Sequence, residues 1–451
     1  MGTIAETYAR FAAGLRFGDL PVEVVHRAKV SVLDLVGVML AGSDMPFPRA
    51  VRDYLSSLGG KHEATMTRTG GRKFPAPSAA LANGICGHAL DMDDGHRFGA
   101  LHPGVPVIPA ALAAAEAIGA DGARLIAGIV TGYEVIIRIS RGINPSHLSR
   151  GFHTTGTVGT FGAAASVGNI IGLDAGRMTH ALGLAGLQSA GLLEILHDGA
   201  MAKPIHPGHA CSAGILAAEL ARRDAQGPRT IFEGPKGFLR AMTDAADRDA
   251  MVAGLGSEWE ILRTYIKLHA ACRHIHPAID CALNIRAAQN VKPSQIQKIS
   301  VETYPVAVQF CGDTIHPDTV SAAKFSLPFS VAMAMYLGDA FTDKYSEENI
   351  RHSAIHELAG RVEVSTKKEW EQSYPRLRGA GMVVTLNDGR QYRHRIDLPH
   401  GEPEYPATQE EIQGKFMANA SLVVPHNHAR AIMDAVMNLE DVPPSRLMEM
   451  L

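Results

Sequence analysis

The segment TGTVGTFGAAASVGNIIG, residues 155–172, decides the fold that we expect for this chain. Its apolar residues recur at helical spacing, and glycine and alanine occupy more than one side of the helix. Small residues on several sides allow neighbouring helix backbones to approach closely. We therefore expect this helix to be buried on several faces inside a tightly packed bundle.

Helical patterns fill almost all of residues 1–265. A proline at its start favours the first of these helices, and Ser78 is a credible N-cap for the second. Most of them share the small-residue composition of the opening segment. The expected helices span residues 21–43, 78–94, 108–119, 123–140, 155–172 and 175–196.

The pattern changes after residue 295. Alternating and β-branched runs predict strands, and Asn387-Asp388-Gly389 supplies the turn of a hairpin. Helical patterns lie between these strands. The expected strands are at 296–310, 359–368 and 381–398, and the expected helices are at 322–337 and 346–357.

The last part of the chain returns to helices. Thr408 and Glu411 have the spacing of a capping box, and a further helix is expected near residues 426–438. The sequence therefore predicts a mainly α protein with two domains. A large all-helical domain spans 1–265 and is completed by 400–451, and a smaller α+β domain spans 266–399.

The composition of the 451 residues, 46% hydrophobic and 20% charged, is that of a globular protein. A formal net charge of −3 gives no general attraction to nucleic acid or to an anionic membrane. The five cysteines form no CxxC pair, and their odd number argues against a disulfide framework. The N-terminus lacks the pattern of a signal peptide, and the apolar residues 104–136 are interrupted by prolines and charges. We therefore expect a cytoplasmic protein.

Four histidines stand directly before proline: His102, His206, His276 and His316. With 21 His and 25 Pro in 451 residues, chance would give 21 × 25 / 451, or about one such pair. Proline restricts the residue before it to non-helical backbone. Each of these histidines is therefore expected at the boundary of an element, where a side chain can be aimed at a site.

The stretch HALDMDDGHRFGALHPG, residues 88–104, is the first candidate for chemistry. His88 and Asp91 share a helix face. Acidic residues at the C-terminal end of a helix oppose its dipole, so local stability does not explain them. A functional explanation is favoured over a solvated helix end. His153, just before a predicted helix start at Thr154, is a further candidate beside its ordinary reading as a cap or core residue.

Two lysines lie in constrained or cationic surroundings. In AKPIHPGHACSAG, residues 202–214, Lys203 could bind a carboxylate or act as a base, and His206 is expected to serve only to shape the backbone. In IKLHAACRHIHPAID, residues 266–280, Lys267 belongs to the densest cationic stretch of the chain. A solvated face is the alternative, but the apolar residues in this stretch favour partial burial.

Other site types are disfavoured. The sequence has no HExxH motif, no zinc-finger spacing, no P-loop and no GxSxG elbow. Asp91, Asp94 and His96 could ligate a divalent cation, but no second pair of ligands completes the set. A scaffold without activity has no need to gather Lys, His and Asp at constrained turns. The residues therefore favour an enzyme over a scaffold and disfavour a metal site.

Five stretches in the right order resemble the methylcitrate dehydratase (MmgE/PrpD) family over nearly the whole chain. The resemblance implies a large all-helical domain, a smaller α+β lid domain, a homodimer and no metal or organic cofactor. It implies one of three activities: 2-methylcitrate dehydration, cis-aconitate decarboxylation or iminodisuccinate epimerisation. The stretches are HALDMDD…HPGVPVIPAALAAAE, KPIHPGHACSAGILAAELARR, KLHAACRHIHPAID, AAKFSLPFSVAMAM and GEPEYPATQEEIQGKF.

The decarboxylase branch of the family implies five active-site positions in this chain. The chain also departs from that branch at two positions: Gly95 replaces a threonine, and Cys272 replaces a histidine of the animal enzymes. The fungal decarboxylases look similar to this chain around Cys272. The implied catalytic residues are Asp91, His102, His153, Lys203 and Lys267.

The family reactions develop charge next to a carboxylate, which requires cations and a positioned proton donor or acceptor. We expect Lys203, Lys267 and Arg273 to bind carboxylates. His102 or His153 would act as general acid or base, with Asp91 orienting a histidine. The weaker candidates are the hydroxyl donors Tyr133 and Tyr304, and His276, for which substrate contact and a structural role are equally open.

The sequence therefore predicts a cofactor-independent lyase that acts on a small di- or tricarboxylic acid. A 2-methylcitrate dehydratase-like reaction is the first hypothesis. Decarboxylation of cis-aconitate and epimerisation of an iminodisuccinate-like acid are the alternatives. The expected partners are the polycarboxylate substrate and a second copy of the chain, and neither nucleic acid nor a membrane is expected.

Overall fold

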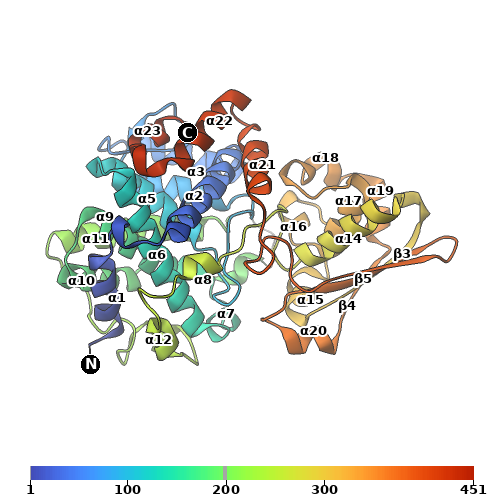
Figure 1. Ribbon diagram of the computed structural model, residues 1–451, viewed down its shortest axis with the longest axis horizontal. Helices are drawn as coiled ribbons and strands as arrows, with labels where there is room; N and C mark the ends of the chain where they lie inside the picture. The colour runs from blue at the N-terminus through green and yellow to red at the C-terminus, as the bar shows by residue number, and fades with distance from the viewer. Residues whose placement is uncertain (1, 197–200) are drawn as a thin grey trace. The chain divides into compact units, whose positions relative to one another are not determined.

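The computed structural model describes residues 2–196 and 201–451, which form two compact units. The larger unit contains Met1–Ala89, Asp93–Tyr265 and Thr408–Leu451. The smaller unit contains Ile266–Ala407 together with the three residues Leu90–Met92. The N-terminal helices and the C-terminal helices thus belong to the same unit, which is coloured blue to green and red in Figure 1.

The larger unit is built around helix α9, Gly159–Ile171, of which every residue up to Ile170 is buried. It packs against α5 (Gly104–Ile118), α6 (Gly122–Ile143) and α11 (Ile205–Arg222). The expectation of a helix buried on several faces is confirmed. The predicted helix 155–172 is in fact divided, because α8 ends at Thr157 and α9 begins at Gly159.

Small residues permit this packing. A Cβ atom added to Gly214 of α11 would lie 2.4 Å from the Cβ of Ala163 in α9. One added to Gly162 of α9 would lie 2.8 Å from the Cβ of Ile136 in α6. Real Cβ atoms do not approach this closely, so the helices can meet only where glycine stands.

The C-terminal helices complete the larger unit. Helix α21, Gln409–Ala420, begins with the predicted capping box of Thr408 and Glu411 and packs on α2, Val22–Gly42. Lys415 of α21 forms a buried ion pair of 2.5 Å with Asp34 of α2. The other helices of this unit are α1 (Ile4–Gly14), α3 (Pro46–Leu58), α4 (Ala76–His88), α7 (Ser146–Ser149), α8 (Thr154–Thr157), α10 (Ala175–Gly186), α12 (Phe238–Met242), α13 (Arg248–Val252), α22 (His426–Met437) and α23 (Pro444–Glu449).

Three details of the helical prediction are wrong. The larger unit also contains a two-stranded sheet of β1 (Ala64–Thr65) and β2 (Lys73–Phe74), so it is not wholly helical. Ser78 does not cap α4, which begins at Ala76 after Pro75, because prolines favour the first helical turn. Helix α10 ends at Gly186 rather than near residue 196, because the chain turns back and the carbonyl of Gly191 accepts from the N–H of His153.

The smaller unit contains a four-stranded sheet in the order β4-β3-β5-β6. Strand β3 (Ile296–Thr303) pairs in parallel with β4 (Val362–Thr366) and antiparallel with β5 (Ala380–Leu386). Strand β6 (Gln391–Ile396) forms the predicted hairpin with β5. The helices of this unit are α14 (His276–Gln289), which packs on β5 and β6, α15 (Pro305–Cys311), α16 (Val320–Ala323), α17 (Leu327–Leu337), α18 (Glu347–Ile350), α19 (Ser353–Ala359) and α20 (Lys368–Ser373).

The strand predicted to residue 310 ends at Thr303, and Val306 lies in helix α15. Pro305 occupies the first turn of that helix, where its missing N–H costs no hydrogen bond. The mainly α architecture with a smaller α+β part is otherwise confirmed. Among the described residues, no helix is both long enough and apolar enough to cross a membrane.

Gly214→Ala tests the close packing of α9 and α11. The new methyl group would overlap Ala163, so we expect a loss of about 1–3 kcal/mol in the free energy of unfolding, measured by urea denaturation. Gly414→Ala is the matched control at an exposed position of helix α21, where nothing lies within 4 Å of an added Cβ. That variant should gain roughly 0.5–1 kcal/mol. Equal effects of the two variants would contradict the packing argument.

Candidate active site

Four histidines of the larger unit, His88, His102, His153 and His206, gather in one place, and we call them the four-histidine cluster. The ring centroids of His88 and His102 are 4.9 Å apart, those of His88 and His153 5.8 Å, and those of His153 and His206 5.2 Å. All four come from helix ends. His88 ends α4, His102 precedes α5, His153 is the residue before α8, and His206 lies in the first turn of α11.

Asp93 fixes the tautomers of the first two histidines. The Nδ1 atom of His88 lies 2.9 Å from a carboxylate oxygen of Asp93, and the Nδ1 atom of His102 lies 3.3 Å from the same oxygen. The Nδ1 atom of His102 also lies 2.8 Å from the backbone carbonyl of Asp94. Carbonyl and carboxylate oxygens only accept, so both Nδ1 atoms carry hydrogen and donate it. Proton exchange with a substrate would therefore use the Nε2 atoms.

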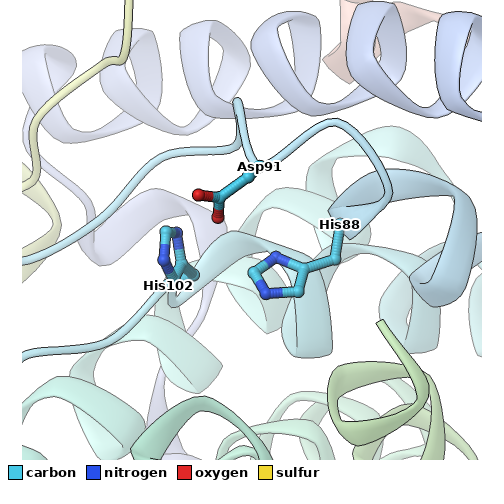
Figure 2. A group of neighbouring side chains, drawn as sticks. All are labelled: His88, Asp91 and His102. Carbon is cyan, nitrogen blue, oxygen red and sulfur yellow. The ribbon is translucent and has the colours of Figure 1, made fainter. Parts of the chain in front are cut away.

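Figure 2 shows how this part of the chain runs. His88 stands at the end of its helix, Asp91 lies on the loop that follows, and His102 comes at the end of that loop. The buried Nε2 atom of His88 has no hydrogen-bond partner among the described residues. Imidazole and carboxylate groups such as these can also ligate divalent metals. Ligation through Nδ1 would require His88 to give up its bond to Asp93.

Asp94 also holds part of the four-histidine cluster in place. Its carboxylate accepts from the hydroxyl of Tyr133 at 2.8 Å and from the N–H of Gly104 at 3.0 Å, at the start of α5. Burial is the largest influence on this carboxyl and raises its pKa to about 7, while the bond from Tyr133 acts in the opposite direction. Tyr133 is fully buried. Its hydroxyl thus serves Asp94, and the predicted contact with substrate stays a prediction.

His153 and His206 form a second pair with different electrostatics. Their Nδ1 atoms are 3.0 Å apart, so one ring donates to the other. Burial, followed by the positive charge of Lys203, lowers the pKa of His153 well below its usual value. Burial, followed by His88 and Lys203, lowers the pKa of His206 to about 4. Both rings are therefore neutral at pH 7, and Lys203 is a half-buried cation beside them.

The structure corrects the expectation for His206. Its sequence position before proline suggested a role in shaping the backbone, yet its ring bonds directly to His153. Both His206 and His276 lie within the first turns of helices, although each stands directly before a proline. Asp93 is a second residue that sequence reasoning did not single out. The position of Asp93 in the acidic stretch 88–104 was its only signal in the sequence.

In the smaller unit, two buried lysines hold the segment Leu90–Met92. Lys267 is 1% exposed, donates to the backbone carbonyl of Asp91 at 2.7 Å and lies 3.3 Å from the carboxylate. Lys324 donates to the carbonyl of Leu90 at 3.0 Å. Asp91 itself has a φ of +52°, which is uncommon for a residue with a side chain. Lys267 is thus more deeply buried than the partial burial expected for its stretch, and Lys324 was missed.

Arg273 and His276 have structural partners in the smaller unit. Arg273 lies 3.0 Å from Glu402 in a buried ion pair and donates to the carbonyls of Pro399 and His400. The ring of His276 lies 3.0 Å from Arg273 through Nδ1 and donates through Nε2 to the carbonyl of Ala271. These bonds hold residues 399–402 against Arg273. A substrate contact by either residue stays a prediction.

Tyr304 is also buried in the smaller unit. Its hydroxyl lies 2.7 Å from Nδ1 of His274. Burial, followed by the charge of Arg378, lowers the pKa of His274 to about 3, so this ring is neutral and accepts or donates without charge. Burial raises the pKa of Tyr304 well above its usual value. A buried, protonated phenol can donate a hydrogen bond, and its contact with substrate stays a prediction.

Comparison with known proteins identifies the family. Residues 6–250 match the MmgE/PrpD N-terminal domain, and residues 269–441 match the MmgE/PrpD C-terminal domain. The chain belongs to the MmgE/PrpD family. A cis-aconitate decarboxylase of Aspergillus terreus is 26% identical over 99% of this chain and 96% of its own length. The cis-aconitate decarboxylase of Homo sapiens is 27% identical over 98% of this chain and 92% of its own length. The protein is therefore a lyase.

Gly95 is one of the two departures from the decarboxylase branch of the MmgE/PrpD family. The ring of Tyr265 fills the space next to it. A Cβ atom on residue 95 would lie 2.3 Å from both the Cζ and the hydroxyl oxygen of Tyr265. The two residues also pair through their backbones, with N–H to carbonyl distances of 3.1 and 2.8 Å. A threonine at position 95 would require the tyrosine ring to move. The position of the buried Tyr265 ring thus requires glycine at residue 95.

Asp94→Asn tests the raised carboxyl pKa through the pH dependence of stability. The native state retains a proton that the unfolded chain releases above pH 4, so the parent protein loses stability as the pH rises from about 4 to 7. The asparagine has no such proton. The stability of the variant relative to the parent should rise over that range, by roughly 4 kcal/mol at most, and level off above it.

Urea denaturation between pH 4.5 and 9, a range set about the shifted carboxyl, measures this difference. Tyr133→Phe is the companion variant, because it removes the hydrogen bond that favours the ionised carboxylate. Its loss of stability should continue to a higher pH than in the parent. Parallel curves for Asp94→Asn and the parent would show that Asp94 is ionised throughout.

Proposed function

We propose that this lyase removes carbon dioxide from cis-aconitate or a closely similar small tricarboxylic acid. The observation that carries the proposal is His102, whose Nδ1 atom lies 3.3 Å from Asp93, in the four-histidine cluster that also includes the two rings on which the charge of half-buried Lys203 acts. Loss of carbon dioxide leaves negative charge on carbon next to a carboxylate, and this charge must be stabilised and then protonated. An imidazole with a fixed tautomer and a cation close by supply both requirements. The similarity to cis-aconitate decarboxylases over the full chain supports the same reaction.

In this proposal His102 is the proton donor. Its Nδ1–H is held by the carbonyl of Asp94, and the nearby carboxylate of Asp93 stabilises positive charge on the ring. The backbone N–H of His102 donates to the hydroxyl of Thr155 at 3.1 Å, which fixes the ring's attachment point. Nε2 is then the atom that delivers a proton to carbon. His88 shares the carboxylate and holds it in place.

Lys203 binds a substrate carboxylate in this proposal. It is half-buried, and its charge already acts on His153 and His206. Because the rings of His153 and His206 are neutral, they attract a substrate carboxylate much less than Lys203 does. Carboxylate binding by Lys267 and the orientation of a histidine by Asp91 stay predictions from the sequence. We further propose, from the family resemblance alone, that the protein works as a homodimer without a cofactor, which light scattering and activity in a metal chelator would test.

Dehydration of a 2-methylcitrate-like hydroxy acid is the second candidate. Elimination of water needs a base to take a proton from carbon and an acid to protonate the departing hydroxyl. The neutral His153–His206 pair offers the base, and His102 offers the acid. Decarboxylation needs only the acid. The presence of a neutral histidine pair beside the carboxylate-bound histidines is the observation that favours this candidate.

A panel of substrates distinguishes the two reactions. The purified protein is incubated with cis-aconitate, 2-methylcitrate, citrate and iminodisuccinate, and products are read by mass spectrometry. We expect cis-aconitate to lose the mass of carbon dioxide and to give itaconate. Loss of water from 2-methylcitrate would instead establish the second candidate. Turnover of none of the four acids would contradict both.

Histidine variants test the assigned roles on the substrate that the panel identifies. His102→Gln should lower kcat about 10²–10⁴-fold, the usual contribution of a proton-transfer group, with a smaller effect on KM. His153→Gln should cost a comparable factor in dehydration and less in decarboxylation. His180→Gln, whose ring bonds to the carbonyl of Gly227, is the control and should leave kcat unchanged. An active His102→Gln enzyme would exclude His102 as the proton donor.

A further inference from the structure

His316, the fourth histidine that stands directly before proline, belongs to the smaller unit and has no part in the proposed reaction. It lies in the segment between α15 and α16, and its side chain is exposed. Its ring meets that of His356 in helix α19, with the ring centroids 5.2 Å apart. The two Nδ1 atoms are 3.0 Å apart, so one ring donates a hydrogen to the other. Two imidazoles from distant parts of the sequence thus face one another.

A backbone carbonyl decides which ring carries that hydrogen. The Nε2 atom of His356 lies 2.5 Å from the carbonyl oxygen of Ile350, the last residue of α18. A carbonyl only accepts, so Nε2 donates, and Nδ1 of the neutral ring presents its lone pair to His316. Histidines that ligate a metal commonly donate their other ring N–H to a backbone carbonyl in this way. His356 therefore has the tautomer and the support of a metal ligand.

Both rings are carried by segments that are held in position. The ring of His356 packs on the fully buried Phe329 of α17, with centroids 5.5 Å apart. The backbone of His316 is restricted by the buried proline that follows it. Two residues earlier in this segment, the carbonyl of Thr314 accepts from the hydroxyl of Ser326, at the start of α17. The pair of nitrogens is thus arranged before any ligand binds.

The spacing of the two nitrogens fits a single metal ion. Imidazole nitrogens lie about 2.0–2.1 Å from a bound divalent metal. Two such nitrogens at a separation of 3.0 Å would subtend roughly 90–97° at the ion. Neighbouring ligands of a square-planar or tetragonal ion are at right angles, and this geometry with nitrogen ligands is typical of copper(II) and nickel(II). A tetrahedral zinc ion would need the nitrogens farther apart.

We propose that His316 and His356 bind one divalent transition-metal ion, copper(II) or nickel(II), through their two Nδ1 atoms. The ion takes the place of the hydrogen between the rings, which moves through water to Nε2 of the exposed His316. Among the residues that the structure describes, no third histidine, cysteine or carboxylate joins the pair within 4.8 Å, so water completes the coordination. Asp313 and Asp318, exposed on the same segment, add negative charge that favours a cation.

A bound ion would tie the segment before α16 to helix α19. Helix α16 ends at Lys324, its C-cap residue, which donates to the carbonyl of Leu90. An ion that binds the folded protein more tightly than the unfolded chain stabilises the folded state. The metal therefore fastens a part of the smaller unit and takes no part in the proposed reaction.

The test titrates nickel(II) into the metal-free full-length protein and measures the ions bound by calorimetry. His316→Ala changes an exposed side chain, and it should raise the dissociation constant of one bound ion by at least about 10–100-fold, the loss that removal of a merely supporting residue causes in metal sites. His394→Ala, whose ring bonds to the amide of Asn284 in the same unit, is the control that should bind as the parent does. Magnesium prefers oxygen ligands and should not distinguish the variants.

X-ray diffraction from nickel-soaked crystals of the parent locates the ion by its anomalous scattering and depends on no variant being folded. We expect a peak between the Nδ1 atoms of His316 and His356. A peak at the four-histidine cluster alone would overturn the proposal, as would equal nickel binding by the parent and His316→Ala. Neither measurement depends on the substrate, so the test stands apart from the outcome of the substrate panel.

Discussion

The close approach of helix backbones to α9 determines where the histidines of the larger unit lie. Glycines at the contacts, such as Gly162 and Gly214, leave no room for a side chain. The helices that meet α9 or its neighbours include α4, α5, α8 and α11, and each carries one histidine of the cluster at or next to one of its ends. A looser bundle would separate these ends. The chemistry of the site thus depends on residues that have no functional groups.

Burial then gives similar side chains different properties. His153 and His206 are neutral because desolvation and the charge of Lys203 both oppose protonation. His88 and His102 share a negative neighbour, Asp93, whose carboxylate lies 2.9 and 3.3 Å from their Nδ1 atoms. One small region therefore contains a pair of neutral imidazoles bonded to each other and a pair whose Nδ1 atoms donate to oxygen. This difference arises from the positions of one lysine and one aspartate and not from the histidines themselves.

Local patterns in the sequence predicted most of the elements but few of the contacts. The helix spacing of residues 159–171 and the capping box at Thr408 act within a few residues, and both were predicted. The strand ending at Thr303 was misread because alternation continues into α15, where the proline at its start decides the outcome. The bond between His153 and His206 joins positions 53 apart and leaves no local signal. Long-range packing determines it, and a single sequence does not show that packing.

The pairing of Gly95 with Tyr265 concerns one of the two positions at which the chain departs from the decarboxylase branch. A threonine hydroxyl lies about 1.4 Å from its Cβ atom, by ordinary covalent geometry. The phenolic oxygen of Tyr265 lies 2.3 Å from where that Cβ would be, so it fills space that a side chain at residue 95 would need. A phenol from a different segment thus lies where a side chain at residue 95 would begin. A phenol is bulkier and more rigid than a threonine side chain, and a site that contains it would favour a substrate with a correspondingly different shape.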